Sequence, residues 1–135
     1  MKISGVLFNP GTGKILILRK KSKLSGSYGR RFVLPEKIAS RERHLFQLKQ
    51  HFKEVLGITV KGLSSQPVRV SIDGVPTDRF VFLLSHNPTQ EIMLNDPTYS
   101  NHEWVTLKEL ENKSMDKYVK QAIFDVVLKY LKPEN

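Results

Sequence analysis

The residues best suited to chemistry lie along one side of a predicted helix. Spacings of three, four and three residues separate His44, Gln47, His51 and Glu54. Side chains at such spacings share one helical face. His51 and Glu54 together offer an imidazole nitrogen and a carboxylate, a pair of ligands that suits a transition metal. The alternative is a polar face that contacts water or a partner.

A second group of candidates lies in and beside a basic loop at 20–31. The chain carries 22 Lys and Arg against 13 Asp and Glu, a net charge of +9 that favours polyanionic partners. Cations of this loop would bind phosphates, and a tyrosine ring would stack on a base. The ligand-binding candidates are therefore Arg19, Lys21, Tyr28, Arg30 and Arg31. The alternative is a long surface loop with solubilising charge.

The elements that must position these residues alternate between strands and helices. Apolar alternation and the intervening turn residues predict strands over 3–8, 14–19, 31–34, 58–60, 67–72, 79–85 and 101–105. The first two should form a hairpin, and the strand at 79–85 should lie at the centre of the sheet. Asp73-Gly74 predicts a turn before that strand.

The candidate face belongs to a helix predicted over 41–56. Ser40 is its expected N-cap, Glu42 lies near its positive end, and Gly57 should stop it. A capping box of Thr106 and Glu109 should open a short helical turn. A final helix follows with Ser114 as its expected cap. This order predicts an α/β fold, a mixed sheet with helices on both faces.

Composition narrows the classes of protein. The 135 residues are 39% apolar, which suits one domain spanning residues 1–135. The chain has no cysteine, which excludes disulfides, thiolate zinc sites and cysteine nucleophiles. No apolar run is long enough to cross a bilayer, and the first residues lack the apolar core of a signal peptide. We expect a cytoplasmic protein with no membrane partner.

The stretch 36–58 contains five residues with a characteristic arrangement: Glu42, Phe52, Glu54, Gly57 and Ile58. FVLP precedes it at 32–35, and HEWVTLKEL follows at 102–110. Together these segments resemble the Nudix (MutT-like) hydrolase family. The family signature is a glycine, five residues, a glutamate, seven residues, and then Arg-Glu-apolar-x-Glu-Glu-x-Gly-apolar. Five of its nine defined positions match.

The resemblance implies a Nudix-like α/β/α sandwich with a mixed β-sheet. In active members, carboxylates on one helical face hold Mg²⁺ or Mn²⁺ against a diphosphate. By this alignment Glu54 and Glu42 are the catalytic candidates, and Glu54, Glu103 and His51 are the metal candidates. Glu103 would be the additional carboxylate that family members bring from outside the motif. Mg²⁺ or Mn²⁺ is expected only if the protein is active, and a binding protein needs neither.

The signature is degenerate at the positions that carry the chemistry. Gln50 replaces the arginine, His51 and Val55 replace two glutamates, and Glu36 with Lys37 replaces the glycine pair. Valine cannot bind a metal, and a neutral imidazole is a poor ligand for a hard cation. Losing half of a metal's transition-state stabilisation would slow the reaction by on the order of a hundredfold or more.

These residues leave several functions open. The leading hypothesis is binding of a nucleotide, a nucleoside-diphosphate derivative or RNA, with weak or no hydrolysis. The alternative is an active, divalent-metal-dependent hydrolase of a nucleoside diphosphate linked to another moiety. A protein-interaction module is the second alternative. The expected partner is a nucleotide or another phosphate-containing ligand, with RNA and a second copy of the chain, as a homodimer, also considered.

Overall fold

The computed structural model describes residues 1–20, 32–40, 42–64 and 66–131. Over these residues the strands are β1 (Lys2–Asn9), β2 (Lys14–Lys20), β3 (Phe32–Val33), β4 (Glu36–Ile38), β5 (Val60–Gly62), β6 (Val68–Ile72), β7 (Val75–His86) and β8 (Tyr99–Val105). The helices are α1 (His44–Leu56), α2 (Leu107–Leu110) and α3 (Lys117–Leu131). None of the helices in these ranges is long and apolar enough to cross a membrane.

One mixed sheet joins the described strands. Its path follows the order β3-β2-β1-β7-β5, while β4 pairs with β1, β6 with β7 and β8 with β2. β1 and β7 are parallel neighbours, and the other pairs are antiparallel. The predicted mixed sheet is therefore confirmed, with β7 beside β1 at its centre.

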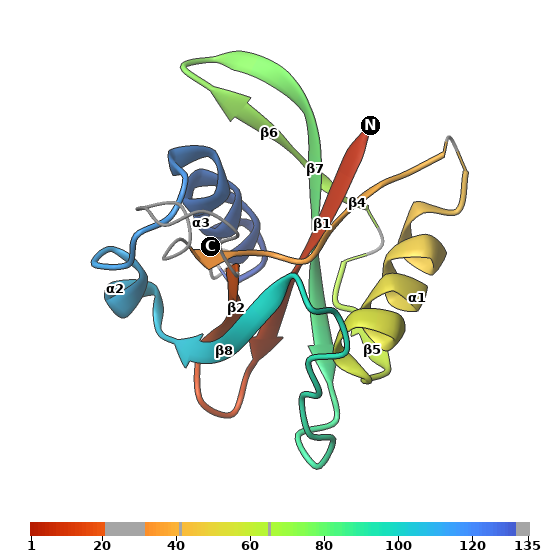
Figure 1. Cartoon of the computed structure of the whole chain (residues 1–135). Coiled ribbons are helices and arrows are strands. Elements are labelled where there is room, and N and C mark those ends of the chain that lie inside the picture. Colours follow the sequence, from red (N-terminus) through yellow and green to blue (C-terminus); the bar gives the residue numbers. More distant parts are fainter. Residues whose placement is uncertain (21–31, 41, 65, 132–135) are drawn as a thin grey trace.

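Helices cover both faces of this sheet, with α1 on one side and α2 and α3 on the other (Figure 1). Consecutive residues of the central strands alternate between the two cores. Val6 and Leu83 pack on the α3 side, whereas Leu7 and Leu84 pack on the α1 side. Burial on both faces explains why these strands are nearly continuous apolar runs in the sequence. The predicted α/β/α sandwich is confirmed.

Helix α1 is fixed to the sheet by its apolar residues. Leu48, Phe52, Val55 and Leu56 are buried in the α1-side core, at the spacings that one helical face requires. Gly57 ends the helix in the left-handed conformation, with φ of 68°, and its N–H donates to the Lys53 carbonyl. The predicted stop at Gly57 is confirmed.

The start of α1 differs from the prediction. The helix begins at His44, preceded by Arg43 with φ of 56°, and no side chain caps it. Instead, the amide nitrogen of Gln47 donates to Ser40 Oγ (2.7 Å) and to the Glu42 carbonyl (2.6 Å). Ser40 therefore contacts the helix through a side chain rather than through the terminal N–H groups. Glu42 precedes the helix instead of lying in its first turn.

β4 is a strand that the sequence did not predict. The preceding strand ends before Pro35, but the chain resumes pairing directly after this proline. Lys37 lies opposite Ile3 of β1 in this antiparallel pair. The strand predicted at 58–60 is also displaced, since β5 comprises Val60–Gly62. The strand β3 is shorter than the predicted 31–34, and residue 31 lies outside the described residues.

One predicted turn and one predicted capping box are confirmed, and one helix cap is corrected. Asp73 and Gly74 have positive φ values of 52° and 80° between β6 and β7, as a tight hairpin requires. Thr106 and Glu109 form the predicted capping box of α2. Before α3, however, Asp116 rather than Ser114 supplies the cap, since its Oδ1 accepts from the Tyr118 N–H at 2.8 Å.

Candidate functional site

Polar groups from three elements lie around His51 of α1. His51 and Glu54 come from the helix, Lys37 from β4 and Asp96 from the segment at 87–98. The charges of Lys37, Glu54 and Asp96 all act on the pKa of His51. We call these four residues the α1 site. Two of them, His51 and Glu54, were candidates from the sequence. Lys37 and Asp96 are additions that the structure supplies.

The segment that carries Asp96 is fixed against the end of α1. The Met93 N–H donates to the Leu56 carbonyl and the Asn95 N–H donates to the Val55 carbonyl, both at 2.9 Å. These bonds satisfy carbonyls that the last turn of a helix leaves unpaired. Asp96 Oδ1 then accepts from the Thr98 N–H at 2.8 Å. The Thr98 backbone and hydroxyl hydrogen bonds lower the pKa of Asp96, so it is ionised at neutral pH.

Strand register directs Lys37 toward α1. Residues directly opposite each other in an antiparallel pair project to the same face of a sheet. Lys37 lies opposite Ile3, which is fully buried in the α1-side core. The Lys37 side chain is partly buried and its charge lowers the pKa of His51. A lysine cation thus stands on the helix side of the sheet, next to the imidazole.

The imidazole of His51 is held neutral. Burial lowers its pKa most, Lys37 lowers it further, and Glu54 and Asp96 act in the opposite direction. Its Nε2 atom is buried and has no hydrogen-bond partner among the described residues.

This arrangement predicts a loss of stability in mild acid. Because the folded pKa of His51 lies below its ordinary value of 6.5, the unfolded chain binds more protons as the pH falls through that value. The free energy of unfolding therefore does not depend on His51 above about pH 6.5 and declines below that pH. For one partly exposed group the decline is less than about 1.4 kcal/mol per pH unit. Urea unfolding of wild type and His51→Gln at pH 7.5 and 5.5 measures the effect. The variant should lose less stability than wild type, and equal losses would exclude His51 as the source.

Of the two predicted catalytic residues, only Glu54 lies within α1, in its last turn. Glu54 is exposed on the outer side of the helix and belongs to the α1 site. Glu42 is exposed in the segment before the helix, where only its backbone carbonyl makes a described contact, with Gln47. The structure does not bring Glu42 into the group around His51.

Glu103 and Arg19 lie on the other face of the sheet. Val105 packs on the α3 side and Trp104 on the α1 side, so alternation places Glu103 on the α3 side. Its carboxylate pairs with the Lys113 ammonium at 2.6 Å. The sheet therefore separates Glu103 from Glu54, and the structure does not bring the two carboxylates together.

Arg19 contributes to a basic edge on that other face. Its guanidinium lies 5.7 Å from the centre of the Phe32 ring, and the Lys113 ammonium lies 5.4 Å from the same ring. The other predicted ligand-binding residues, Lys21, Tyr28, Arg30 and Arg31, lie outside the described residues.

The groups at the α1 site do not fit a Mg²⁺ or Mn²⁺ centre. These hard cations prefer several oxygen ligands, whereas position 51 is an imidazole and Val55 is a buried apolar side chain. The ammonium of Lys37 also opposes a second cation beside His51. Within the described ranges, no three His, Asp or Glu side chains form a group that could hold a metal ion.

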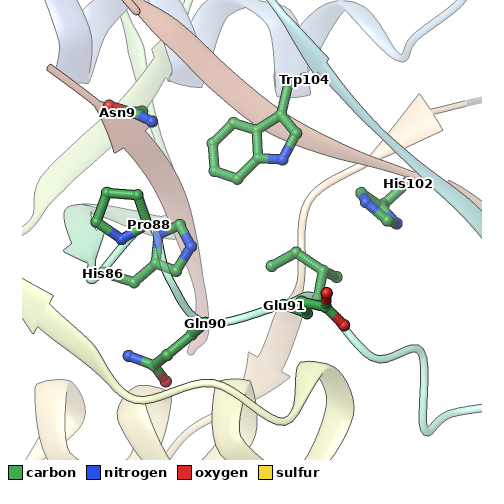
Figure 2. Close-up of a pocket in the computed structure, with 8 residues that line it drawn as sticks. Asn9, His86, Pro88, Gln90, Glu91, His102 and Trp104 are labelled. Atoms are coloured by element: carbon green, nitrogen blue, oxygen red, sulfur yellow. The ribbon is translucent and has the colours of Figure 1, made fainter. Parts of the chain in front are cut away.

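A pocket of about 410 Å³ opens on the other side of the segment at 87–98 (Figure 2). Its lining includes Asn9 at the end of β1, His86 at the end of β7, Glu91, and His102 and Trp104 of β8. The rings of His86 and Trp104 stack with centroids 5.6 Å apart and planes 10° apart. We call this cavity the Trp104 pocket. Trp104 is partly buried against the α1-side core and also lines the pocket.

The residues that the sequence did not single out are brought in by long-range contacts. Asp96 is 45 residues from His51 along the chain, and His86 is 18 residues from Trp104. Asp96-Pro97-Thr98 does carry a local signal, because an aspartate commonly accepts from the N–H two residues later. Nothing local places that turn beside α1. Placing Lys37 at this site from the sequence would have required the register of β4, a strand that was not predicted.

No family model matches this chain, and no curated protein sequence matches it. Solved structures do match its fold. A UDP-X diphosphatase has a TM-score of 0.69 at 12% identity, over 97% of this chain and 62% of that one. The MutT protein from Methanosarcina mazei Go1 has 0.65 at 16% identity, over 97% and 91% of the two chains. The NUDIX domain of Shewanella oneidensis NrtR, solved with ADP ribose, has 0.62 at 12% identity, over 97% and 87%.

These similarities define the class of protein. The chain has the Nudix fold, as its sequence resemblance implied, and this fold is shared with hydrolases of nucleotide derivatives. At 12–16% identity the likeness extends to the fold alone.

Proposed function

We propose that this protein binds a nucleotide or a nucleoside-diphosphate derivative, with weak or no hydrolysis. The observation that carries the proposal is the position of Lys37. This lysine replaces a glycine of the pair in the Nudix signature, and it projects toward α1 beside His51. A lysine ammonium binds phosphate oxygens as a point charge. Lys37 can thus neutralise part of a diphosphate that a divalent cation neutralises in an active enzyme.

Other features support a ligand of this kind. The NUDIX domain of Shewanella oneidensis NrtR, which shares the fold, was solved with ADP ribose. The net charge of +9 favours anionic ligands, RNA among them. Arg19 adds a cation on the opposite face of the sheet. The cysteine-free composition agrees with a function in the cytoplasm.

Asp96 is the observation that favours the alternative, a metal-dependent hydrolase. It places an ionised carboxylate close enough to His51 to act on its pKa, as Glu54 does. Glu54 and Asp96 then supply two carboxylates. A hard divalent cation prefers more oxygen ligands than these two provide. This second function would use Glu54 and Asp96, with neither Glu42 nor Glu103 nearby.

Calorimetric titration with ADP-ribose, in EDTA and then in Mg²⁺, tests the proposed function. We expect the same affinity in both buffers and product formation at background. Lys37→Ala should weaken binding about tenfold through loss of a charge-assisted hydrogen bond. Lys61→Ala, which removes an exposed lysine of β5, should bind like wild type.

Two results would redirect the assignment. Mg²⁺-dependent turnover that is lost in both Glu54→Gln and Asp96→Asn would establish the hydrolase instead. If neither nucleotides nor an RNA oligomer raised the melting temperature, the protein-interaction module would replace the ligand-binding function.

A further inference from the structure

The Trp104 pocket is a second candidate binding site, separate from the α1 site. Its volume of about 410 Å³ lies in the range of small-molecule sites, about 300–1,000 Å³. The segment at 87–98 runs between the two sites: Glu91 lines the pocket, whereas Asp96 faces His51. The function proposed above uses no residue of this pocket.

The charge of the Trp104 pocket does not suit phosphate. Among its described lining residues there is no lysine or arginine, although the whole chain has a net charge of +9. Glu91 contributes an exposed carboxylate, and the described residues place no cation in an ion pair with it. A carboxylate accepts hydrogen bonds and repels anions. The pocket therefore favours a ligand with N–H donors over one with phosphate oxygens.

The aromatic groups of the pocket favour a flat ligand. His86 and Trp104 present nearly parallel rings, and burial lowers the pKa of His86 despite a hydrogen bond to the Gln90 backbone that acts in the opposite direction. The imidazole is therefore neutral at pH 7. Trp104 also packs against the α1-side core, which fixes its orientation. Planar rings pack against such a fixed aromatic pair at low entropic cost.

Hydrogen-bonding groups stand at the edge of this aromatic surface. Figure 2 shows the nitrogen edge of the Trp104 indole turned toward the side of the pocket where His102 and Glu91 lie. The indole N–H donates only, and the carboxylate accepts only. Within the described residues neither group is used in a hydrogen bond. A ligand edge with an amino group next to a ring nitrogen complements this donor and acceptor pair.

We propose that the Trp104 pocket binds a planar nitrogen heterocycle bearing an amino group, the class to which adenine and cytosine belong. The ring packs against the His86 and Trp104 pair, and its amino group donates to Glu91. This inference goes beyond the proposed function because the site needs no phosphate and no contact with Lys37. Adenosine, which has the amino group and lacks phosphate, is the appropriate probe.

Trp104 makes the test direct, because it is the only tryptophan in the chain. Its fluorescence reports on the pocket without a label. We expect adenosine to change the emission saturably, and inosine, which has a carbonyl group in place of the amino group, to bind about tenfold more weakly. Glu91→Gln should weaken adenosine binding about tenfold, the effect of losing a charged hydrogen-bond acceptor. Glu91 is exposed, so this variant should fold normally.

Matched variants separate this site from the α1 site. Glu111→Gln removes an exposed carboxylate elsewhere, and Lys37→Ala alters the α1 site; neither should change adenosine binding. No saturable signal up to about 10 mM adenosine, equal binding of inosine, or full affinity in Glu91→Gln would each overturn the inference. An equal signal from inorganic pyrophosphate would also overturn it. ADP-ribose contains adenosine and can occupy either site. The part of its binding that depends on Lys37 tests the proposed function, whereas adenosine binding that depends on Glu91 tests this inference, so the two proposals fail separately.

Discussion

Replacing Phe52 with alanine is expected to lower the free energy of unfolding by about 3–5 kcal/mol. Phe52 is fully buried in the α1-side core. Its ring lies directly on β1, since a Cβ added to Gly5 would come within 2.7 Å of Phe52 Cε1. Loss of the ring leaves a cavity between α1 and the sheet that the backbone cannot readily close. Small domains are stable by about 5–15 kcal/mol, so urea unfolding followed by circular dichroism should show a large decrease in the midpoint.

Phe46 provides a matched control on the same helix. Its side chain is 45% exposed, and the Arg43 guanidinium lies 4.2 Å from the ring centre. Phe46→Ala should therefore lower the free energy of unfolding by no more than about 1 kcal/mol. Both variants remove the same atoms from the same helix, so any difference reports burial. Equal losses would contradict the observed orientation of α1.

The orientation of α1 is also the part of the fold that the sequence predicted best. Leu48, Phe52, Val55 and Leu56 are spaced as one helical face, and Gly57 supplies the left-handed stop. The central strands were equally clear because burial on both faces makes them continuous apolar runs. Both signals are local and strong. A mixed sheet between two helical layers followed from the order of the elements.

The predictions of the fold were wrong where a local sequence signal was compatible with two different structures. Ser40 is a favoured N-cap residue, yet its hydroxyl is used by Gln47 seven residues later. Pro35 ends one strand, but its missing N–H does not prevent pairing at Lys37, where β4 meets Ile3. Propensity alone could not choose, because in each case a tertiary contact decides the outcome.

The candidate site was predictable in part. His51 and Glu54 follow from helical spacing, and the structure places them together. Asp96 and Lys37 reach the same site through the pairing of separate segments, which no spacing in the sequence reveals. Glu103 is different, since a buried Val105 two residues later implies that both side chains share one face of the sheet. That period-two signal was available in the sequence.

The largest expected gain of function comes from replacing two residues of the α1 site. In Lys37→Gly with His51→Glu, carboxylates at positions 51 and 54 would face Asp96 without the lysine cation. Three converging carboxylates suit a hard divalent cation. For a dissociation constant of about 0.1 mM, Mg²⁺ at about 10 mM would stabilise the double variant by about 2.7 kcal/mol. Thermal unfolding with and without Mg²⁺ measures this shift, and wild type should show none.

The control variant carries the new carboxylate one residue earlier. Lys37→Gly with Gln50→Glu has the same charge as the double variant, but residue 50 is exposed and lies about 100° around the helix from His51. It should respond to Mg²⁺ like wild type, and an equal response would mean that general charge rather than the α1 site binds the ion. Even a successful double variant should hydrolyse ADP-ribose no faster than background, because Val55 and Gln50 still replace a carboxylate and the arginine of the signature. If the double variant bound Mg²⁺ without hydrolysing ADP-ribose, the loss of metal binding and the loss of catalytic activity would be separable.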